Sequence, residues 1–412
     1  MDRILNLARR DIPLTKAYPW LLGTAMIPLW FAYLKAFGAN VTIAVIGSLG
    51  PDSVARHKEL GNDLMLFWPV AHLIRAGHAS EIYNPALFSK FQNAYFGNSV
   101  PGYFQCPYLP PGLLPPLLLA PFGILSGYLV WTVTLTGISI VLLRRTGMPW
   151  PVILLGLASV ASIFNLLAGQ LGLLTGAVFI LGLDSIDRLP RRAAVCFGSL
   201  IIKPQAGLLA PIILLARGSY RLIVGSAIIV GFLCILATII CGYHIWPAYF
   251  LEGTASAHKI LVAPFPNQYE DNGASVFWMM RSLGATVSVA LATQVSSGVG
   301  ASVWCWIAWR RESADRRALM ALTCALTLLV TPYCYTVDLC GLVLMVAWLA
   351  WERRKLQTAD VLIWMWPALC PIIATSLHME LTPLILLLGA IRAYHRLDGI
   401  GTTAPACYPA SV

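Results

Sequence analysis

Long apolar stretches, separated by short clusters of charged residues, constrain this fold more than any other feature of the sequence. Stretches such as 17–37, 220–242 and 286–309 contain almost no charged side chains. Crossing the hydrocarbon core of a bilayer, about 30 Å thick, takes roughly 17 to 25 apolar residues. Only 11% of the 412 residues are charged, against about 25% in typical soluble domains. The sequence therefore predicts an all-α, polytopic integral membrane protein.

Clusters of basic residues between the apolar stretches predict which loops face the cytoplasm, because cytoplasmic loops carry an excess of Lys and Arg. The clusters are Arg9/Arg10/Lys16, Arg144/Arg145, Arg188/Arg191/Arg192, Arg217/Arg221, Arg310/Arg311/Arg316/Arg317, Arg353/Arg354/Lys355 and Arg392/Arg396. The outline that follows has about ten to twelve spans. They lie near 17–37, 127–143, 150–168, 170–183, 193–203, 205–216, 220–242, 286–309, 318–333, 337–351, 359–377 and 379–391. Both termini are then cytoplasmic.

This topology predicts a single membrane domain over residues 1–396, followed by a disordered tail, 397–412. A long loop, 38–126, lies on the non-cytoplasmic face, and its Pro-rich end predicts a re-entrant or interfacial helix. The spans near 170–183, 193–203 and 205–216 are shorter than a full crossing, which favours half-helices or broken helices that meet at mid-depth.

The remaining composition excludes several other classes of protein. The net charge of +10 comes from clusters between apolar spans and not from a basic stripe with interleaved aromatics, so it indicates membrane topology and no nucleic-acid partner. The ten cysteines show no CxxC or Cys/His spacing. They are interpreted as small apolar residues.

Unusual polar residues gather on the predicted non-cytoplasmic side. An ionisable residue at membrane depth is costly and indicates a functional site. The candidate residues are Asp63, Tyr108 in "YLPP", Gln170 in "AGQ", Lys203 and Gln205 in "KPQ", His258 and Lys259 in "SAHKI", and Tyr333 and Asp338 in "TPYCYTVD".

The order of these motifs carries a resemblance to a known family. "FWPVAHLIRAGHASEIYNP", "YLPPGLLPPLLLAPFG", "GQLGLL", "IIKPQAGLL" and "TPYCYTVDL" follow one another between about residues 60 and 350. This pattern resembles glycosyltransferase family 87. The resemblance implies a polytopic transferase of the GT-C type. It also implies a donor sugar, often mannose, linked to polyprenyl phosphate and used at the periplasmic face of a bacterial inner membrane.

The chemistry of such a transfer suits two of the candidate residues. A carboxylate within reach of a sugar hydroxyl can take its proton as the new bond forms, and Asp63 suits that role. The leaving lipid phosphate needs a fixed cation, for which Lys203 is the best candidate. One carboxylate acting as base, without a second as nucleophile, favours direct displacement with inversion. The sequence has no DxD, so a monophosphate lipid donor is favoured, and no metal or cofactor is predicted.

The other candidates are predicted to bind substrate. These are Tyr108, Gln170, Gln205, His258, Lys259, Tyr333 and Asp338. Aromatic side chains are expected to stack on sugar faces and line the lipid groove. They are Phe67, Trp68, Tyr83, Tyr103 and Tyr108.

Each assignment has a structural alternative. Asp63 and Asp338 each precede an apolar helix and suit an N-cap role, whereas Lys203 can extend to the membrane interface. Gln170 and Gln205 can join helices by hydrogen bonds. His258 and Lys259 are typical of a solvated loop.

Two other functions stay open from the sequence. A secondary transporter or lipid-linked-sugar translocase also uses interrupted spans with polar residues at mid-depth, but no internal repeat is evident. A non-catalytic membrane scaffold has no need for Asp63 and Lys203 on one face. The transferase interpretation implies a glycolipid or polysaccharide acceptor and contact with membrane lipids.

Overall fold

The protein is an assembly of helices in the computed structural model, which describes residues 11–13, 63–96, 105–265 and 272–398. The predicted first span, Tyr103 and residues 399–412 lie outside the described residues. The α-helices up to the middle of the chain are α3 (Leu64–Arg75), α4 (Pro85–Phe96), α5 (Ile124–Arg145), α6 (Trp150–Leu157), α7 (Val160–Ala168), α8 (Gly172–Ser185), α9 (Pro190–Ser199) and α10 (Ala210–Ala216).

The second half of the described chain continues in the same way. Its α-helices are α11 (Tyr220–Cys241), α12 (Ile245–Ala248), α13 (Thr254–Val262), α14 (Val276–Ser282), α15 (Val287–Trp309), α16 (Arg316–Val330), α17 (Cys340–Arg353), α18 (Thr358–Leu377) and α19 (Thr382–Tyr394). Short 3-10 turns are η2 (Ala79–Ile82), η3 (Pro110–Leu113), η4 (Pro115–Leu119), η5 (Leu200–Ile202), η6 (Pro204–Gly207) and η9 (Thr336–Leu339), and η7 (Tyr249–Gly253) is a π-helical turn. One antiparallel strand pair joins β1 (Asp11–Pro13) to β2 (Lys355–Gln357).

Three described helices, α5, α11 and α18, are long and apolar enough to cross a membrane. The pair α6 and α7, bent by 60°, makes a fourth if it is counted as one broken span. Each predicted span from 127–143 onward contains a described helix, whereas α3, α4, α12, α13 and α14 lie outside the predicted spans. Helices α8 and α19 are shorter than a full crossing. The fold is thus helical as predicted, while the total of ten to twelve spans stays a prediction.

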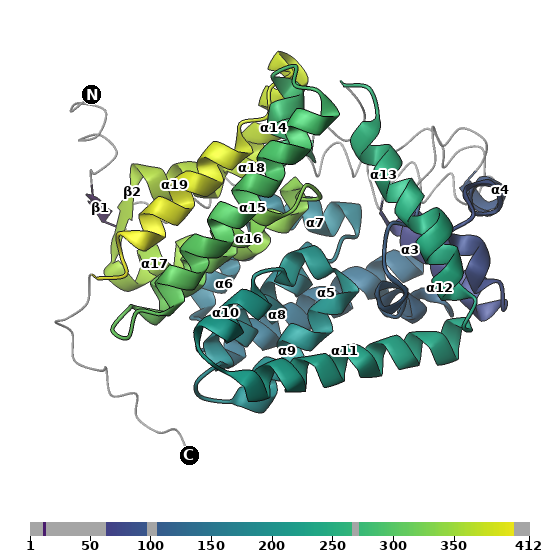
Figure 1. Cartoon of the computed structure of the whole chain (residues 1–412), viewed down its shortest axis with the longest axis horizontal. Helices are drawn as coiled ribbons and strands as arrows, with labels where there is room; N and C mark the ends of the chain where they lie inside the picture. The colour runs from purple at the N-terminus through teal and green to yellow at the C-terminus, as the bar shows by residue number, and fades with distance from the viewer. Residues whose placement is uncertain (1–10, 14–62, 97–104, 266–271, 399–412) are drawn as a thin grey trace.

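Apolar stripes cover the outer faces of the long helices. In α11, Ile228 and Ile239 are 64% and 74% exposed, and α15 exposes a row of valines. Figure 1 shows α11 running along the lower edge of the molecule, where it packs on α9. Contiguous exposed apolar surface of this kind marks a membrane or protein interface.

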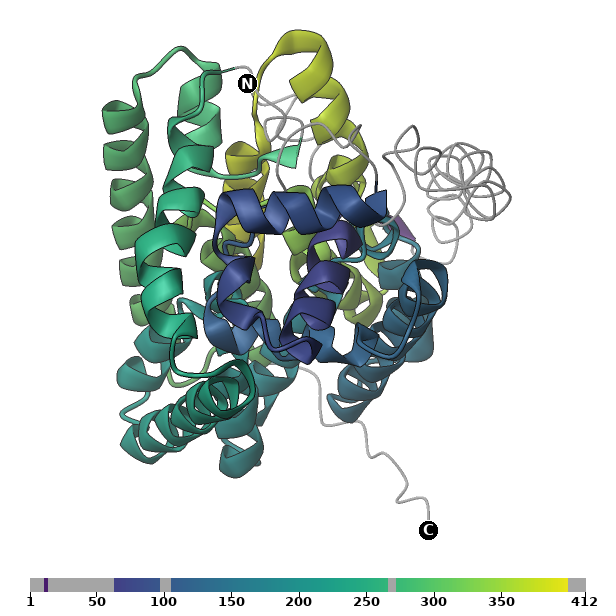
Figure 2. The same ribbon diagram turned by 90° about the vertical axis from the view of Figure 1, so that its right-hand side faces the viewer.

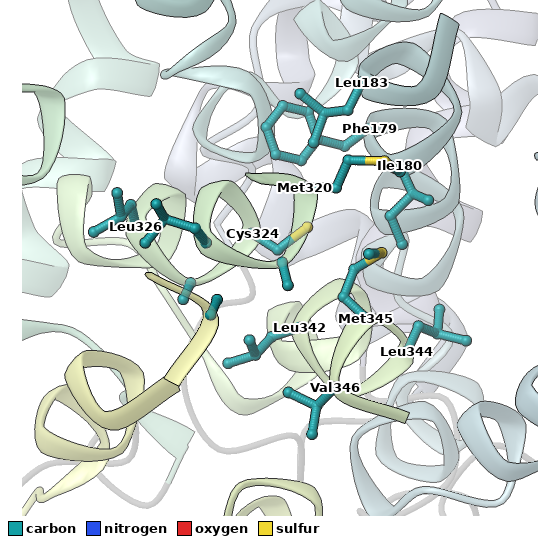
Figure 3. Packing of buried hydrophobic residues seen from close by; sticks show 14 of the residues in the cluster. Phe179, Ile180, Leu183, Met320, Cys324, Leu326, Leu342, Leu344, Met345 and Val346 are labelled. Atoms are coloured by element: carbon teal, nitrogen blue, oxygen red, sulfur yellow. The ribbon is translucent and has the colours of Figure 1, made fainter. Parts of the chain in front are cut away.

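The core lies where α8, α16 and α17 meet. Figure 3 shows Phe179 and Ile180 of α8 facing Met320 and Cys324 of α16, with Met345 of α17 between them. The nine described cysteines are free, and most are buried, in accord with their interpretation as small apolar residues. Helices α15, α16 and α19 pack against one another on one side of this core.

The chain is broken at Lys203, between η5 and η6. Lys203 adopts φ −146° and ψ 76°, and the Pro204 that follows disfavours a helical conformation for the residue before it. The sequence predicted this interruption. A lysine placed at a break extends away from the helix axis, and here it points into the protein, where it is 3% exposed.

The end of the described chain packs on the bundle. The Leu397 carbonyl accepts a hydrogen bond from the Asp315 N–H at 3.1 Å, and Asp398 pairs with Arg311 at 3.1 Å. The first two residues of the predicted tail are therefore in contact with the folded protein.

Candidate active site

Asp63 stands at the start of α3, and α3, in purple, lies at the end of the molecule that Figure 2 brings to the front. Its backbone N–H donates to the Ala168 carbonyl at 3.0 Å, and its own carbonyl accepts from the Leu66 and Phe67 N–H groups. Its side chain makes no capping hydrogen bond. The N-cap alternative is therefore wrong for this carboxylate, which is left for another partner.

The Gln170 side chain is the hydrogen-bonding group that lowers the pKa of the Asp63 carboxyl. The Gln170 side-chain oxygen also accepts a hydrogen bond from the Tyr108 hydroxyl at 3.3 Å and one from the Leu171 N–H at 3.2 Å. Tyr108 is fixed in turn, because its carbonyl accepts a 2.6 Å hydrogen bond from the buried Tyr83 hydroxyl. Three predicted site residues thus form one connected group.

Lys203 and Asp338 complete the cluster. The Lys203 ammonium donates to Asp338 Oδ1 in an ion pair whose side chains are 3% and 9% exposed. Lys203 therefore does not extend to an interface. Asp338 Oδ2 accepts a second hydrogen bond, from the Tyr335 N–H at 3.2 Å, so Asp338 both stabilises the start of η9 and neutralises the lysine.

Two glycines allow these segments to approach closely. A Cβ on Gly112, just after the "YLPP" segment, would lie 2.7 Å from the Ile202 carbonyl oxygen, next to Lys203. A Cβ on Gly172, at the start of α8, would lie 2.0 Å from the Val337 carbonyl oxygen, next to Asp338. The glycines within the motifs therefore permit the backbone contacts that bring the polar side chains together.

The electrostatic environment of Asp63 raises its pKa to about 6 from an ordinary value of 3.8. Removal of the carboxyl from water is the largest cause, because burial disfavours the charged form. The hydrogen bond from Gln170 and the positive charge of Lys203 oppose this increase, whereas the negative charge of Asp338 adds to it. The result is a carboxylate that is mostly ionised at pH 7 and more basic than an ordinary aspartate.

A small cavity lies on another side of Asp338. It encloses about 30 Å³ and is lined by Asp338, Gln205 and Thr331, together with residues of α8, α16 and α17. A cavity of this volume holds about two water molecules and no sugar. Gln205 and Asp338 therefore share the wall of this cavity.

Three predicted binding residues lie apart from the cluster. His258 and Lys259 are exposed on α13, and no contact joins them to Asp63 within the described residues. The Tyr333 hydroxyl donates to the Ala257 carbonyl at 3.3 Å, so Tyr333 fastens α13 to the loop that precedes η9.

The predicted aromatic groove residues are mostly part of the core. Phe67, Trp68 and Tyr83 are 1%, 4% and 2% exposed. The Phe67 ring packs on Tyr108 at 5.3 Å between centroids. These aromatic side chains pack in the core next to the site and do not line an open surface. The expectation that they face a groove is therefore wrong for these three.

Sequence reasoning missed two residues beside the site, Trp131 of α5 and Asn165 of α7. Both are buried, at 1% and 3% exposure, and both donate a hydrogen bond to the turn that carries Gln170. Asn165 offered a signal, because it is a polar residue inside an apolar stretch. Trp131 offered none, since a tryptophan in a membrane span is expected to pack as an apolar residue.

The described residues contain no group of three His, Cys, Asp or Glu side chains placed to hold a metal ion.

Comparison with known proteins assigns the chain to a class. No curated protein and no solved structure matched the chain. The apolar helices and a match to a family of sugar-transferring enzymes define a membrane glycosyltransferase. The chain belongs to glycosyltransferase family 87, whose sequence profile matches residues 104–332, more than half of its length.

The family match covers the centre of the site but not its ends. Tyr108, Gln170 and Lys203 lie inside the matched residues, whereas Asp63 and Asp338 lie outside them. The contacts described above are what join the matched and unmatched parts of the chain.

Proposed function

We propose that this glycosyltransferase moves a hexose, with mannose the first candidate, from a polyprenyl-phosphate donor to a glycolipid or polysaccharide acceptor. We place the reaction at the periplasmic face of a bacterial inner membrane. The observation that carries the proposal is the group of Asp63, Gln170, Tyr108, Lys203 and Asp338, which five separate segments of the chain bring together.

The proposed reaction is a single displacement with inversion. The acceptor hydroxyl oxygen attacks the anomeric carbon while the bond from that carbon to the phosphate oxygen breaks. Asp63 takes the hydroxyl proton. A pKa near 6 supports this role, because a general base works best when its pKa lies close to the working pH.

The electron pair of the broken bond leaves with the lipid phosphate. Lys203 supplies the positive charge that stabilises this leaving group. In the absence of donor the ammonium is held by Asp338, so it is fixed in place before the phosphate arrives. A preorganised cation needs no rearrangement of water during the reaction, which supports its assignment to the transition state.

The test is transfer of radiolabelled mannose from polyprenyl-phosphate-mannose by purified protein in nanodiscs, with a cell-derived lipid extract as acceptor. Asp63→Asn removes the base and retains the shape of the side chain, so transfer is expected to fall by about 10²- to 10⁴-fold. Asp398→Asn is the matched control, because Asp398 is an 80% exposed partner of Arg311 remote from the cluster. It is expected to keep wild-type transfer.

The outcome that overturns the proposal is an Asp63→Asn enzyme that transfers as fast as the wild type. Transfer from a polyprenyl-phosphate glucose or arabinose donor, and not from the mannose donor, would correct the sugar and leave the mechanism standing. Uptake of a solute without consumption of any polyprenyl-phosphate sugar would replace the transferase with a transporter.

A further inference from the structure

The turn between α7 and α8 carries Gln170, and three successive carbonyls of this turn are each fixed by a different segment. The Ala168 carbonyl accepts from the Asp63 N–H at 3.0 Å. The Gly169 carbonyl accepts from the Trp131 indole N–H at 2.8 Å. The Gln170 carbonyl accepts from the Asn165 side-chain amide at 3.0 Å.

The turn also has a conformation that only a few residues adopt without strain. Gly169 ends α7 with φ 76° and ψ 28°, in the left-handed region that favours glycine. The Asn165 side-chain oxygen accepts from the Leu173 N–H at 3.0 Å, so Asn165 clamps both sides of the turn. The direction in which Gln170 leaves the backbone is therefore set by Asn165 and Trp131.

We infer that Trp131 is a positioning residue for Asp63 and acts through the Gly169–Gln170 turn. The indole N–H does not touch the carboxylate. It holds the carbonyl next to Gln170, whose side chain then meets Asp63 and Tyr108. Asn165 has the same role from the other side of the turn.

The inference rests on the proposed function for its catalytic meaning, but its structural content can be measured separately. The Gln170 hydrogen bond holds the Asp63 pKa down. If Trp131 places Gln170, removal of the indole N–H weakens this hydrogen bond, and the Asp63 pKa rises further. The other groups that act on Asp63 are the charges of Lys203 and Asp338, with the Tyr108 phenol beside them. The Trp131 indole N–H donates to the Gly169 carbonyl and to none of these groups, so its removal acts on the turn.

The test variant is Trp131→Phe, which retains an aromatic ring against Phe67, 5.4 Å away between centroids, and removes the N–H. Trp309→Phe is the matched control. Trp309 is equally buried, at 1% exposure, and its indole N–H donates a 2.8 Å hydrogen bond to Thr323. Both variants lose one buried hydrogen bond, but only Trp131 contacts the turn.

The measurement is the pH dependence of Asp63 labelling by dicyclohexylcarbodiimide, an apolar reagent that reacts with the protonated carboxyl, read by mass spectrometry of the Asp63 peptide. In the wild type, labelling is expected to fall through a midpoint near pH 6. Trp131→Phe is expected to raise this midpoint by about one pH unit, as expected for the loss of a hydrogen bond to a charged group. Trp309→Phe is expected to leave it unchanged.

Gln170→Leu removes the hydrogen bond completely and is expected to give the largest rise of the labelling midpoint. The double variant Gln170→Leu/Trp131→Phe is expected to have the same midpoint as Gln170→Leu alone, because both changes act on the same hydrogen bond. The acid side of the pH profile of kcat/KM is expected to shift to higher pH by the same amount as the labelling midpoint. At pH 6, a midpoint raised by one unit lowers transfer about fivefold.

A Trp131→Phe midpoint equal to that of the wild type overturns the inference, as does a Gln170→Leu variant that labels like the wild type. If Trp131→Phe does not fold, Asn165→Ala removes the hydrogen bond on the Gln170 carbonyl, and its midpoint must also rise. Labelling reports the protonation of Asp63 and not transfer. An active Asp63→Asn enzyme would therefore refute the proposed function without affecting this measurement.

Discussion

Lys203 and Asp338 lie 135 residues apart in the sequence and form an ion pair in the interior, with side chains 3% and 9% exposed. Two charges withdrawn from water are stable only while they stay paired. The pair fixes the break between η5 and η6 against η9. It is at once a structural link and the cation that we assign to the leaving phosphate.

Breaking this pair is expected to destabilise the protein strongly. Lys203→Met leaves the Asp338 carboxylate buried and unpaired, and about 3–5 kcal/mol of unfolding free energy is expected to be lost. The double variant Lys203→Met/Asp338→Leu is expected to recover most of it, because no uncompensated charge remains. Thermal unfolding in detergent checks both.

The exposed pair of Arg311 and Asp398 serves as control, since Asp398 is 80% exposed. Asp398→Asn removes this pair and leaves the Arg311 contacts with Tyr394 in place, and it is expected to cost about 0–1 kcal/mol. Equal losses at the two pairs would contradict the buried role of Lys203. The loss of stability also means that Lys203→Met alone confounds folding with donor binding, so donor use is better measured in the double variant.

The raised pKa of Asp63 predicts that stability falls as the pH rises. Between the unfolded value of 3.8 and the folded value of about 6, the folded state binds more protons than the unfolded state, so ionisation of Asp63 costs stability across this window. Asp63→Asn carries no charge. It is expected to be more stable than the wild type at pH 8 by roughly 1–3 kcal/mol, with the difference vanishing below about pH 4.

Unfolding temperatures at pH 4, 6 and 8 check this prediction, with Asp398→Asn as the control that shows no such trend. A less stable Asp63→Asn at pH 8 would mean that the carboxylate is held by more favourable contacts than those described. The same ionisation predicts that transfer declines as the pH falls through 6, because only the deprotonated carboxylate is a base.

The close approach of α8 to η9 predicts that alanine costs far more stability at Gly172 than at Gly137. Gly172→Ala would place a Cβ 2.0 Å from the Val337 carbonyl oxygen, so the backbone beside Asp338 must move. A loss of about 1–3 kcal/mol, typical of overpacking, is expected together with loss of transfer.

Gly137→Ala in α5 is the control, because a Cβ there meets nothing within 4 Å. It is expected to be neutral or to stabilise the helix by up to about 1 kcal/mol. Comparison of the two unfolding temperatures in one detergent is sufficient. A Gly172→Ala variant as stable as Gly137→Ala would disprove the contact.

The apolar outer face of α11 predicts that a charged side chain there makes membrane insertion less favourable. Ile228 is 64% exposed, and a lysine at the centre of a span is expected to raise the free energy of insertion by about 2.5–3.5 kcal/mol. A glycosylation-mapping assay of membrane insertion checks Ile228→Lys against Ile228→Leu. Efficient insertion of the lysine variant would show that this face of α11 does not meet lipid.

The long helices were largely predictable, because each one follows an apolar stretch that the sequence displays directly, whereas α4 and α13 lie outside the predicted spans. The break at Lys203 was predictable too, since Pro204 restricts the residue before it. Asp63, Gln170 and Lys203 were singled out for their polarity in apolar surroundings. Local patterns carry this information without knowledge of the fold.

The pairing of those residues was not predictable. Nothing near Lys203 in the sequence identifies Asp338 as its partner, because the contact depends on where distant helices pack. Trp131 escaped notice for the same reason, since its indole N–H has a role only through the Gly169 carbonyl. His258 and Lys259 were singled out by residue type alone, and the fold places them on an exposed helix.

The separation of Lys203 from Asp338 has a consequence for how the protein is made. At about 5–20 residues per second, the ribosome adds Asp338 roughly 7–27 s after Lys203, because 135 residues separate them. During that interval the lysine segment is without its counterion. The newly made chain must therefore keep this segment near water or protein until α16 and η9 arrive, so the last third of the chain completes the insertion of its middle.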